Sequence, residues 1–399
     1  MTQLAITAVL VLLVVLITRY VLLLWFGYLH HVEALELPVD PVIAPPVTVI
    51  IPAYNEAKVI DAALRSVIAL RYPRFDVLVV DDGSTDDTLA VASRYAGTTG
   101  AVTVRVVHQT NGGKASALNT GISLARTPFV LCMDGDSRLD PDTLRHAMRH
   151  FAEPNVAAVA GNVKVANRES LWSKLQALEY VEGLNMARRA QGFLRVVNIV
   201  PGPIGVFRRD VLLSIGGYDD DTFAEDADLT LKLLTGGWHV VYEERAIAYT
   251  EAPETLHQLV KQRYRWTRGI LQALRKRAGW VIAPRHGVAI WLSFLAMLFE
   301  AIVWPALNVL GNVLFATAAL SAGAASGVLY WWVLLTMLDV AAALHAVGME
   351  GEDLRLVPYA VAYRFFFIIT IDVAKLGATI EELANVRMTW GKLERVGHL

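Results

Sequence analysis

The sequence contains a single cysteine, Cys132, among 399 residues. One thiol excludes an intramolecular disulfide and is typical of a domain that works in a reducing compartment. Cys132 lies in an apolar run, so we interpret it as a buried filler side chain rather than a nucleophile. Charge is also sparse, since charged residues make up 19% of the chain and the net charge is −2. Nothing in this balance points to a nucleic-acid partner, and we expect none.

Polar residues are scarce at the two ends of the chain. Hydrophobic residues make up 55% of the sequence and the mean hydropathy is +0.42, more than a soluble protein usually carries. The excess lies in residues 4–28 and 287–380. The beginning also lacks the positive charge and the cleavage site of a secretory signal, so we expect an uncleaved anchor. Arg19 lies within it, where a charge is costly unless it faces protein, water or the interface.

Acidic residues are missing from residues 257–287, although this stretch is rich in positive charge. Beside a membrane helix, such a block is typical of a cytoplasmic segment at the membrane interface. Its basic residues are Lys261, Arg263, Arg265, Arg268, Arg275, Lys276, Arg277 and Arg285.

These contrasts divide the chain into six predicted segments. They are a transmembrane anchor over 1–30, a proline-rich linker over 31–46, a cytoplasmic globular domain over 47–254, basic interfacial helices over 255–285, two to four transmembrane helices over 286–380 and a cytoplasmic tail over 381–399. The implied location is the inner or plasma membrane of the cell.

The last apolar part contains segments near 287–304, 306–323, 327–347 and 357–379, of which the second is short enough to be re-entrant. Because the domain and the tail are expected on the same side, the number of spans between them must be even. Four spans are expected if the acidic Glu350-Gly351-Glu352-Asp353 turn lies outside, and two are the alternative. Two polar residues within these segments, Glu300 and Asp339, are functional candidates.

The globular part alternates between short β-branched runs and helical patterns. This order predicts an α/β fold with a mostly parallel sheet, which binds ligands at the carboxyl ends of its strands. Strands are predicted over 47–52, 76–80, 102–107 and 129–133, and helices over 56–70, 85–96 and 114–125.

Polar clusters follow several of these predicted strands. They are Tyr54-Asn55-Glu56, the run from Asp81 to Asp86, and Asp134-Gly135-Asp136, while Asn111-Gly112-Gly113-Lys114 opens a helix. Each cluster alone could be a turn or a helix cap. Carboxylates gathered at one edge repel each other unless a cation or a ligand lies between them. Together the clusters therefore indicate a site for a divalent cation and a diphosphate.

These residues resemble the inverting family 2 glycosyltransferases, whose pattern runs from P-x-Y-N-E through D-D-G-S-T-D and N-x-G-K to D-x-D. The resemblance covers residues 47–280 and implies a GT-A-type, Rossmann-like glycosyltransferase domain. By position it assigns donor-nucleotide binding to Tyr54, Glu56, Asp82, Lys114 and Asp134. It also implies that Asp134 and Asp136 hold Mg²⁺ or Mn²⁺.

Two further motifs resemble those of the processive members. Ala224-Glu225-Asp226 is similar to the T-E-D motif, with Ala224 in place of the usual Thr, and 262–266 matches Q-x-x-R-W. Among processive enzymes the chain is most similar to bacterial poly-β-1,6-N-acetylglucosamine synthases, which are related to hyaluronan, chitin-oligosaccharide and cellulose synthases. The resemblance implies a UDP-sugar donor, expected to carry N-acetylglucosamine, and a growing polysaccharide acceptor.

The implied chemistry is direct displacement at the anomeric carbon, which needs a base and a charge stabiliser. Asp226 is the expected base, and Glu225 ranks below it as a cap or supporting carboxylate. Arg265 would stabilise the leaving diphosphate, and Gln262 and Trp266 would face the acceptor sugar. Alternatively, residues 255–280 form a basic amphipathic helix that only lies on anionic lipid.

Two other functions remain open from the sequence. A lipid-carrier or glycolipid glycosyltransferase would use the same nucleotide domain but should lack the Q-x-x-R-W motif. A sugar-nucleotide sensor or a secretion scaffold should lose Asp226 or the D-x-D pair. The expected further partners are the lipid bilayer and either an accessory subunit or a second copy of the chain.

Overall fold

The computed structural model describes residues 2–36, 44–100, 102–283, 287–320, 325–386 and 397. Residues 37–43 of the predicted linker lie outside this described part, as do Arg387, Lys392 and Arg395 of the predicted tail. The first helix, α1, runs over Thr2–Glu36. It continues past the predicted end of the anchor at residue 30 because residues 31–36 contain neither proline nor glycine.

The middle of the chain forms one mixed sheet, in which the described strands follow the order β3-β4-β2-β1-β5-β8-β7-β9-β6. The strands are β1 (Val47–Ala53), β2 (Phe75–Asp81), β3 (Gly97–Thr99), β4 (Val102–His108), β5 (Phe129–Cys132), β6 (Ser137–Leu139), β7 (Val156–Val165), β8 (Gly205–Arg208) and β9 (His239–Thr250).

The prediction of a mostly parallel sheet is correct for only one half of it. Strands β4, β2, β1 and β5 are parallel neighbours. By contrast, β8 is antiparallel to both β5 and β7, and β6 is antiparallel to β9. Strand β3 is also antiparallel to β4, whereas β7 and β9 are parallel to each other. The difference arises because the antiparallel strands β3, β6 and β8 are short and were not among the four predicted strands.

Helices cover both faces of the sheet. One apolar cluster packs α2, α5 and α6 against β1, β2 and β7, and a second packs α4, α8 and α9 against the opposite face. Every residue of β1 and of β7 is buried, as expected for strands covered on both sides. The helical segments of this domain are α2 (Ile60–Ile68), α3 (Thr88–Ser93), α4 (Lys114–Leu124), α5 (Thr143–Met148), η1 (Arg149–Ala152), α6 (Leu171–Glu179), η2 (Tyr180–Asn185), α7 (Met186–Phe193), α8 (Arg209–Ser214) and α9 (Glu225–Thr235).

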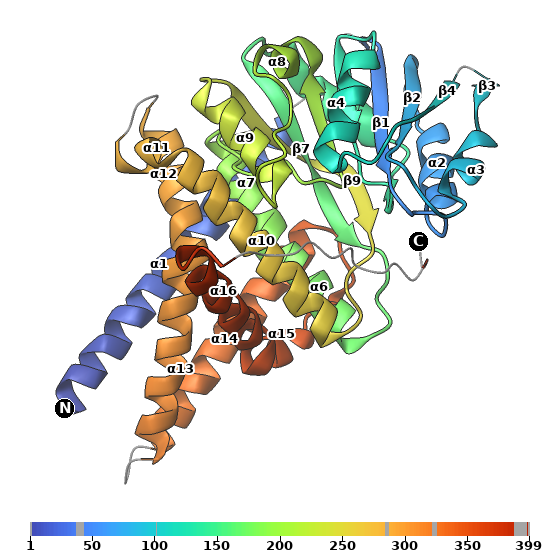
Figure 1. Ribbon diagram of the computed structural model, residues 1–399. Coiled ribbons are helices and arrows are strands. Elements are labelled where there is room, and N and C mark those ends of the chain that lie inside the picture. Colours follow the sequence, from blue (N-terminus) through green and yellow to red (C-terminus); the bar gives the residue numbers. More distant parts are fainter. Residues whose placement is uncertain are drawn as a thin grey trace.

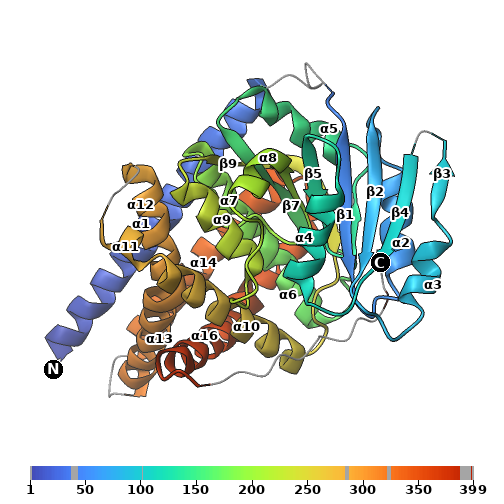
Figure 2. The same cartoon turned by 45° about the horizontal axis from the view of Figure 1, so that its top comes forward.

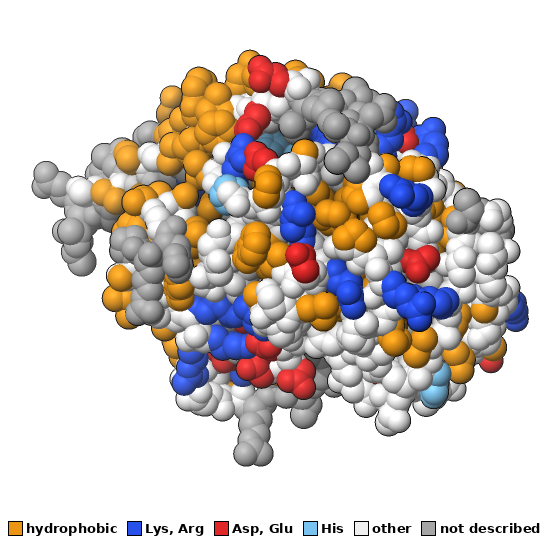
Figure 3. Space-filling view, turned by 90° about the horizontal axis from the view of Figure 1, so that it is seen from above, with side chains coloured by type: hydrophobic (Ala, Val, Ile, Leu, Met, Phe, Trp, Pro, Cys, Tyr) orange, Lys and Arg blue, Asp and Glu red, His pale blue; other side chains and the backbone are white. Residues whose placement is uncertain are grey.

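A second helical layer follows the sheet domain. Figure 1 shows α1, α13 and α14 projecting below the sheet domain, with α10 and α16 crossing between them and the sheet. The segments of this layer are α10 (Leu256–Lys276), α11 (Ala278–Ile282), α12 (Val288–Leu298), η3 (Phe299–Val303), α13 (Trp304–Leu320), α14 (Ala325–Met349), η4 (Leu354–Leu356), α15 (Tyr359–Ala362), η5 (Tyr363–Phe367) and α16 (Ile368–Leu383). Seen from above, charged side chains of both signs are scattered over the sheet domain, and apolar ones gather towards the side of α1 and α12 (Figure 3).

Three segments after the sheet domain are long and apolar enough to cross a membrane: Val288–Leu314, Trp332–Met349 and Leu354–Leu383. The predicted segments 287–304 and 306–323 are not separate, because η3 joins them into one continuous helical run. Pro305 lies inside this run, directly after the π-helical turn, and the wider π-turn accommodates the proline ring that would otherwise clash with the preceding turn. Among the described residues, three candidate segments therefore lie in the region where two to four transmembrane helices are predicted.

The acidic turn after α14 lies against the sheet domain, which is not the position on which the expectation of four spans depended. Arg189 on α7 donates to Glu350 with 2.7 Å between Nη2 and Oε1, and Lys164 on β7 lies 3.1 Å from Glu352. Arg168 also pairs with Glu352. The Arg189 and Glu350 side chains are each 1% exposed. Buried charges require such partners, and this requirement places the turn next to the strands.

The segment Leu354–Leu383 is held at both ends, by the sheet domain at its beginning and by α10 at its end. Its beginning follows Glu352, which pairs with Arg168, and at its end Glu382 accepts from Arg268 on α10 at 2.7 Å. Between these ends, Phe367 and Ile371 pack against Leu259 of α10. Figures 1 and 2 show α16 running alongside α10 rather than beside the far ends of α13 and α14.

Glu300 and Asp339, the two polar residues singled out within the apolar segments, each pair with a residue of α1. Arg19 on α1 lies 2.7 Å from Glu300 and its guanidinium lies over the ring of Trp304 at 4.9 Å. Tyr20 donates to Asp339 at 3.0 Å, and Asp339 also pairs with Arg364. These contacts join α1 to η3 and α14, which gives Glu300 and Asp339 a role in holding the helices together.

Candidate active site

The predicted polar clusters meet at one edge of the sheet. The parallel register of β1, β2 and β5 brings their carboxyl ends together, and the residues after each strand line a cavity of about 950 Å³. A cavity of this size is at the upper end of ordinary ligand sites. Its lining includes Tyr54, Glu56, Asp82, Lys114, Asp134 and Asp136 from the predicted donor and metal positions, together with Glu225 and Arg265.

Asp82 organises the loop that precedes α4. Its carboxylate accepts from the backbone N–H groups of Gly112 at 2.9 Å and Gly113 at 2.8 Å, and from the Gln109 side chain at 2.7 Å. Gly113 has a φ of 87°, which a side chain would oppose. Asp82 therefore lines the cavity and also fixes the conformation of the loop before α4, which lines the cavity as well.

Lys114 lies at the centre of the carboxylates. Its Nζ is 2.6 Å from Asp134 Oδ1 and 2.7 Å from Glu225 Oε1. Burial alone would lower the pKa of Lys114, but the two carboxylates outweigh it and the pKa is raised. Burial raises the pKa of Asp134, and neighbouring Asp136 adds to this while Lys114 opposes it. The arrangement joins the start of α4 to the strand end after β5 and to the start of α9.

Gly202 packs directly against this ion pair. A Cβ atom at this position would lie 2.8 Å from both Asp134 Oδ2 and Lys114 Nζ. Such distances are too short for real Cβ contacts, so a side chain at this position would force the end of the Asp134 or Lys114 side chain to shift.

The two carboxylates at the start of α9 have different surroundings. Burial would raise the pKa of Glu225, but the Lys114 ammonium outweighs it and the pKa is lowered. Burial and the Glu225 charge raise the pKa of Asp226 to about 6. Glu225 lines the large cavity, whereas both carboxylates line a small enclosed space behind Lys114. Asp226 is therefore the better proton acceptor near neutral pH.

Of the three residues predicted from Q-x-x-R-W, Arg265 lines the large cavity. Gln262 is 5% exposed and Trp266 is partly buried against the core. The guanidinium of Arg263 lies over the Trp266 ring at 4.2 Å, so a sugar that stacks on Trp266 must use the other face of the ring.

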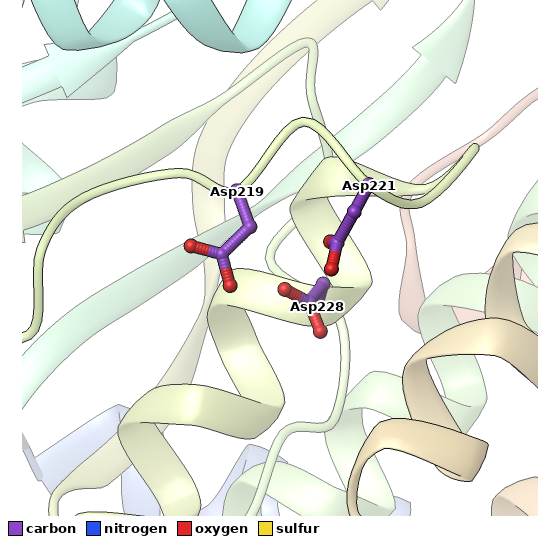
Figure 4. Close-up of side chains that lie close together, drawn as sticks. All are labelled: Asp219, Asp221 and Asp228. Atoms are coloured by element: carbon purple, nitrogen blue, oxygen red, sulfur yellow. The ribbon is translucent and has the colours of Figure 1, made fainter.

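An acidic loop borders the cavity on the α9 side. Asp219 and Asp221 on this loop point towards Asp228 on α9 (Figure 4). The three carboxylates are close enough for a metal ion, but the Lys276 ammonium lies 2.9, 2.7 and 3.0 Å from Asp219, Asp221 and Asp228. Because Lys276 supplies the positive charge that this cluster requires, the cluster joins α10 to α9.

Some cavity residues were not among the predicted ones. They are Asp219, Asp220, Asp221, Thr222, Phe223 and Gln272. The run of three aspartates before Ala224-Glu225-Asp226 is a sequence signal that could have identified the loop. Gln272 carries no such signal, since it reaches the cavity only through the packing of α10 on α9.

A mixed sheet with a carboxylate-lined cavity at the ends of its parallel strands is the architecture of a GT-A-type glycosyltransferase. The chain belongs to the glycosyltransferase-like family 2, whose model matches residues 45–269. It is therefore a glycosyltransferase enzyme.

Two of the curated proteins that the chain resembles are from staphylococci. The chain is 33% identical over 224 residues to the poly-beta-1,6-N-acetyl-D-glucosamine synthase of Staphylococcus aureus strain COL, a match covering 56% of this chain and 54% of that protein. It is 30% identical over 257 residues to the synthase of the same name from Staphylococcus epidermidis, covering 64% of this chain and 61% of that one. The chain thus spans between half and two thirds of the length of these relatives.

A solved structure shares the fold. The mannosyltransferase PcManGT from Pyrobaculum calidifontis, in complex with GDP-Man and Mn²⁺, superposes with a TM-score of 0.71 at 22% identity. The superposition covers 96% of this chain and 99% of that chain. It therefore extends to the helical layer after the sheet domain.

Proposed function

We propose that the chain is a membrane-embedded, processive, inverting glycosyltransferase that builds a β-linked extracellular polysaccharide from a UDP-sugar. The observation that carries the proposal is the position of Glu225 beside Lys114, Asp134 and Arg265 at the large cavity. Asp226 follows Glu225 on α9 and lines, together with Lys114 and Asp134, the small space next to it. N-acetylglucosamine is the proposed sugar because the similar staphylococcal relatives are named as poly-N-acetylglucosamine synthases.

The donor is proposed to lie along the strand ends. Tyr54, Glu56 and Asp82 line the part of the cavity next to β1 and β2, where the uridine would bind. Asp134 and Asp136 offer hard oxygen ligands that suit Mg²⁺ or Mn²⁺, and Gly202 leaves space beside Asp134. When bound, such a cation would neutralise the charge of the leaving diphosphate.

Asp226 is proposed to accept the proton of the attacking sugar hydroxyl. Its pKa of about 6 makes it a stronger base than Glu225, whose carboxylate is engaged by Lys114. The hydroxyl oxygen forms a bond to the anomeric carbon as the bond to the diphosphate breaks, which inverts the centre. Arg265 would pair with the leaving diphosphate because guanidinium matches phosphate geometry. Gln262 and the open face of Trp266 are proposed to contact the acceptor.

The proposed topology has the sheet domain in the cytoplasm. Val288–Leu314 leaves the domain and Trp332–Met349 returns to the acidic turn held by Lys164 and Arg189. Both ends of Leu354–Leu383 lie against the domain or α10, so we propose that this segment lies in the membrane interface. Two spans then follow the domain, and α1 is the proposed anchor. Secretion of the polymer through so few helices would need an accessory subunit or a second copy.

The test is a donor screen on the purified chain in lipid nanodiscs with Mg²⁺ or Mn²⁺. Labelled UDP-N-acetylglucosamine, UDP-glucose and UDP-glucuronate are supplied in parallel, with Asp226→Asn as the control. High-molecular-weight product that disappears in the control supports the proposal and names the sugar. Label confined to a single-sugar lipid would replace it with a lipid-carrier enzyme, and donor binding without turnover would replace it with a sensor.

A further inference from the structure

The helix that carries the two catalytic carboxylates starts without a side-chain cap. Ala224 is the N-cap residue of α9 and makes no side-chain cap hydrogen bond, and within the first turn the Asp226 carboxylate accepts from the backbone N–H of Ala227 at 2.8 Å. Ser, Thr, Asp or Asn at this position would normally accept from the first turn and fix it. Since Glu225 and Asp226 lie in that first turn, their position depends on what the neighbouring elements provide.

Helix α10 provides the missing support through its backbone and one side chain. A Cβ atom on Gly269 would lie 2.5 Å from both the Cβ and the N of Ala224, so the two backbones pack in direct contact. One turn further, Gln272 Oε1 accepts from the backbone N–H of Phe223 at 3.1 Å. Phe223 immediately precedes the N-cap, so this hydrogen bond fixes the chain where it enters α9.

The Gln272 carboxamide is itself oriented by helix α16. Its Nε2 donates to Glu382 Oε2 at 3.1 Å. An amide that flipped would turn its oxygen towards this carboxylate and its NH₂ towards the N–H of Phe223, and both contacts would be repulsive. Glu382 therefore selects the orientation in which Gln272 can accept from Phe223.

Glu382 is held firmly enough for this role. Arg268 on α10 donates to the same oxygen at 2.7 Å, and a second guanidinium nitrogen of Arg268 donates to the carbonyl of Val386 at 2.6 Å. The Arg268 and Glu382 side chains are 4% and 12% exposed. Water competes weakly at such exposures, so the hydrogen bonds retain their strength.

We propose that Glu382 is a positioning residue, which holds the start of α9 in its active arrangement through Gln272 and the backbone of Phe223. It touches no substrate. It links α16, proposed above to lie in the membrane interface, to the carboxylates that perform the transfer. The proposal rests on the proposed transferase function for its kinetic consequence, but the link between Glu382 and Phe223 exists independently of the reaction.

The experiment compares Glu382→Ala, Glu382→Gln and Arg275→Ala in nanodiscs. Arg275 is the matched control, because it donates to Asn385 at 3.1 Å and so joins the same two helices without reaching Gln272. We expect Glu382→Ala to lower kcat about tenfold or more, with KM for UDP-N-acetylglucosamine little changed, because misplaced catalytic groups slow chemistry more than binding. Glu382→Gln keeps an acceptor for Gln272 and should restore most of the rate, and Arg275→Ala should match the wild type.

A second readout does not depend on turnover. Amide hydrogen exchange of the peptide containing Phe223 should become faster in Glu382→Ala and in Gln272→Ala, and remain unchanged in Arg275→Ala. Exchange that is equal in all variants would overturn the proposal, as would a wild-type kcat in Glu382→Ala. A wild-type protein that transfers no sugar would overturn the proposed function alone, and the exchange data would still decide on Glu382.

Discussion

Lys114 on α4 and Glu225 on α9 meet across the cavity, with 2.7 Å between Nζ and Oε1. The same ammonium contacts Asp134 at 2.6 Å. Three elements that are distant in the sequence therefore share one positive charge. Loss of this charge would leave two partly buried carboxylates facing each other, because the side chains of Asp134 and Glu225 are only 25% and 14% exposed.

Replacement of Lys114 by alanine should lower kcat about a hundredfold or more, since it removes a preorganised charge from the site of diphosphate departure. Release of UDP from UDP-N-acetylglucosamine measures the effect. Lys58→Ala is the control, because Lys58 is exposed. A Lys114→Ala protein with wild-type kcat would show that Lys114 serves the fold and not the reaction.

Substitution of Gly202 by alanine should raise the metal concentration needed for half-maximal activity about tenfold, because its Cβ would force Asp134 or Lys114 to move. Titration of Mg²⁺ and Mn²⁺ against activity measures this shift. The matched change is Gly183→Ala, whose Cβ would meet its nearest neighbour at an ordinary 3.9 Å. Equal metal requirements in the two variants would contradict the assignment of Asp134.

The pH profile should show the titration of Asp226. A base must be deprotonated, and burial together with Glu225 raises the pKa of Asp226 to about 6. We therefore expect kcat to be constant above this pH. Below it, kcat should fall about tenfold for each pH unit, as for any reaction that requires one deprotonated base. The measurement is kcat at saturating donor and metal from about pH 5 to 8. A profile that stays flat down to pH 5 would point to another base.

Cysteine labelling should place both ends of Leu354–Leu383 on the side of the sheet domain. The native Cys132 is buried, and burial raises the pKa of its thiol to about 12, so it gives no background. Arg355→Cys and Val386→Cys should both react with an impermeant maleimide added on the domain side of vesicles. Thr317→Cys, near the far end of α13, is the control for the opposite side. Labelling of positions 355 and 386 from opposite sides would establish a span.

The strand ends of the site could be predicted because they depend on local patterns. Tyr54, Asp82 and Asp134 each follow a buried run, and parallel strands bring such positions to one edge whatever the rest of the fold does. Lys114 was predicted for a similar reason, since a glycine-rich turn before a helix is visible in the sequence.

The remaining parts depend on contacts that no local pattern records. Gln272 reaches Phe223 across 49 positions, and Arg189 reaches Glu350 across 161. The second contact brings the acidic turn to the sheet domain, which the sequence left open. A run of apolar residues also cannot distinguish a helix that crosses a bilayer from one that lies on it, because the difference is set by where its two ends are held.

Helix α16 exposes Ile380 and Leu383 by 67% and 73%, one on either side of Glu382. If Glu382 positions Glu225 and Asp226, and α16 lies in the membrane interface as proposed, lipid in contact with these two side chains becomes an allosteric effector, and α16 is its receptor. Turnover would then depend on the thickness and packing of the bilayer.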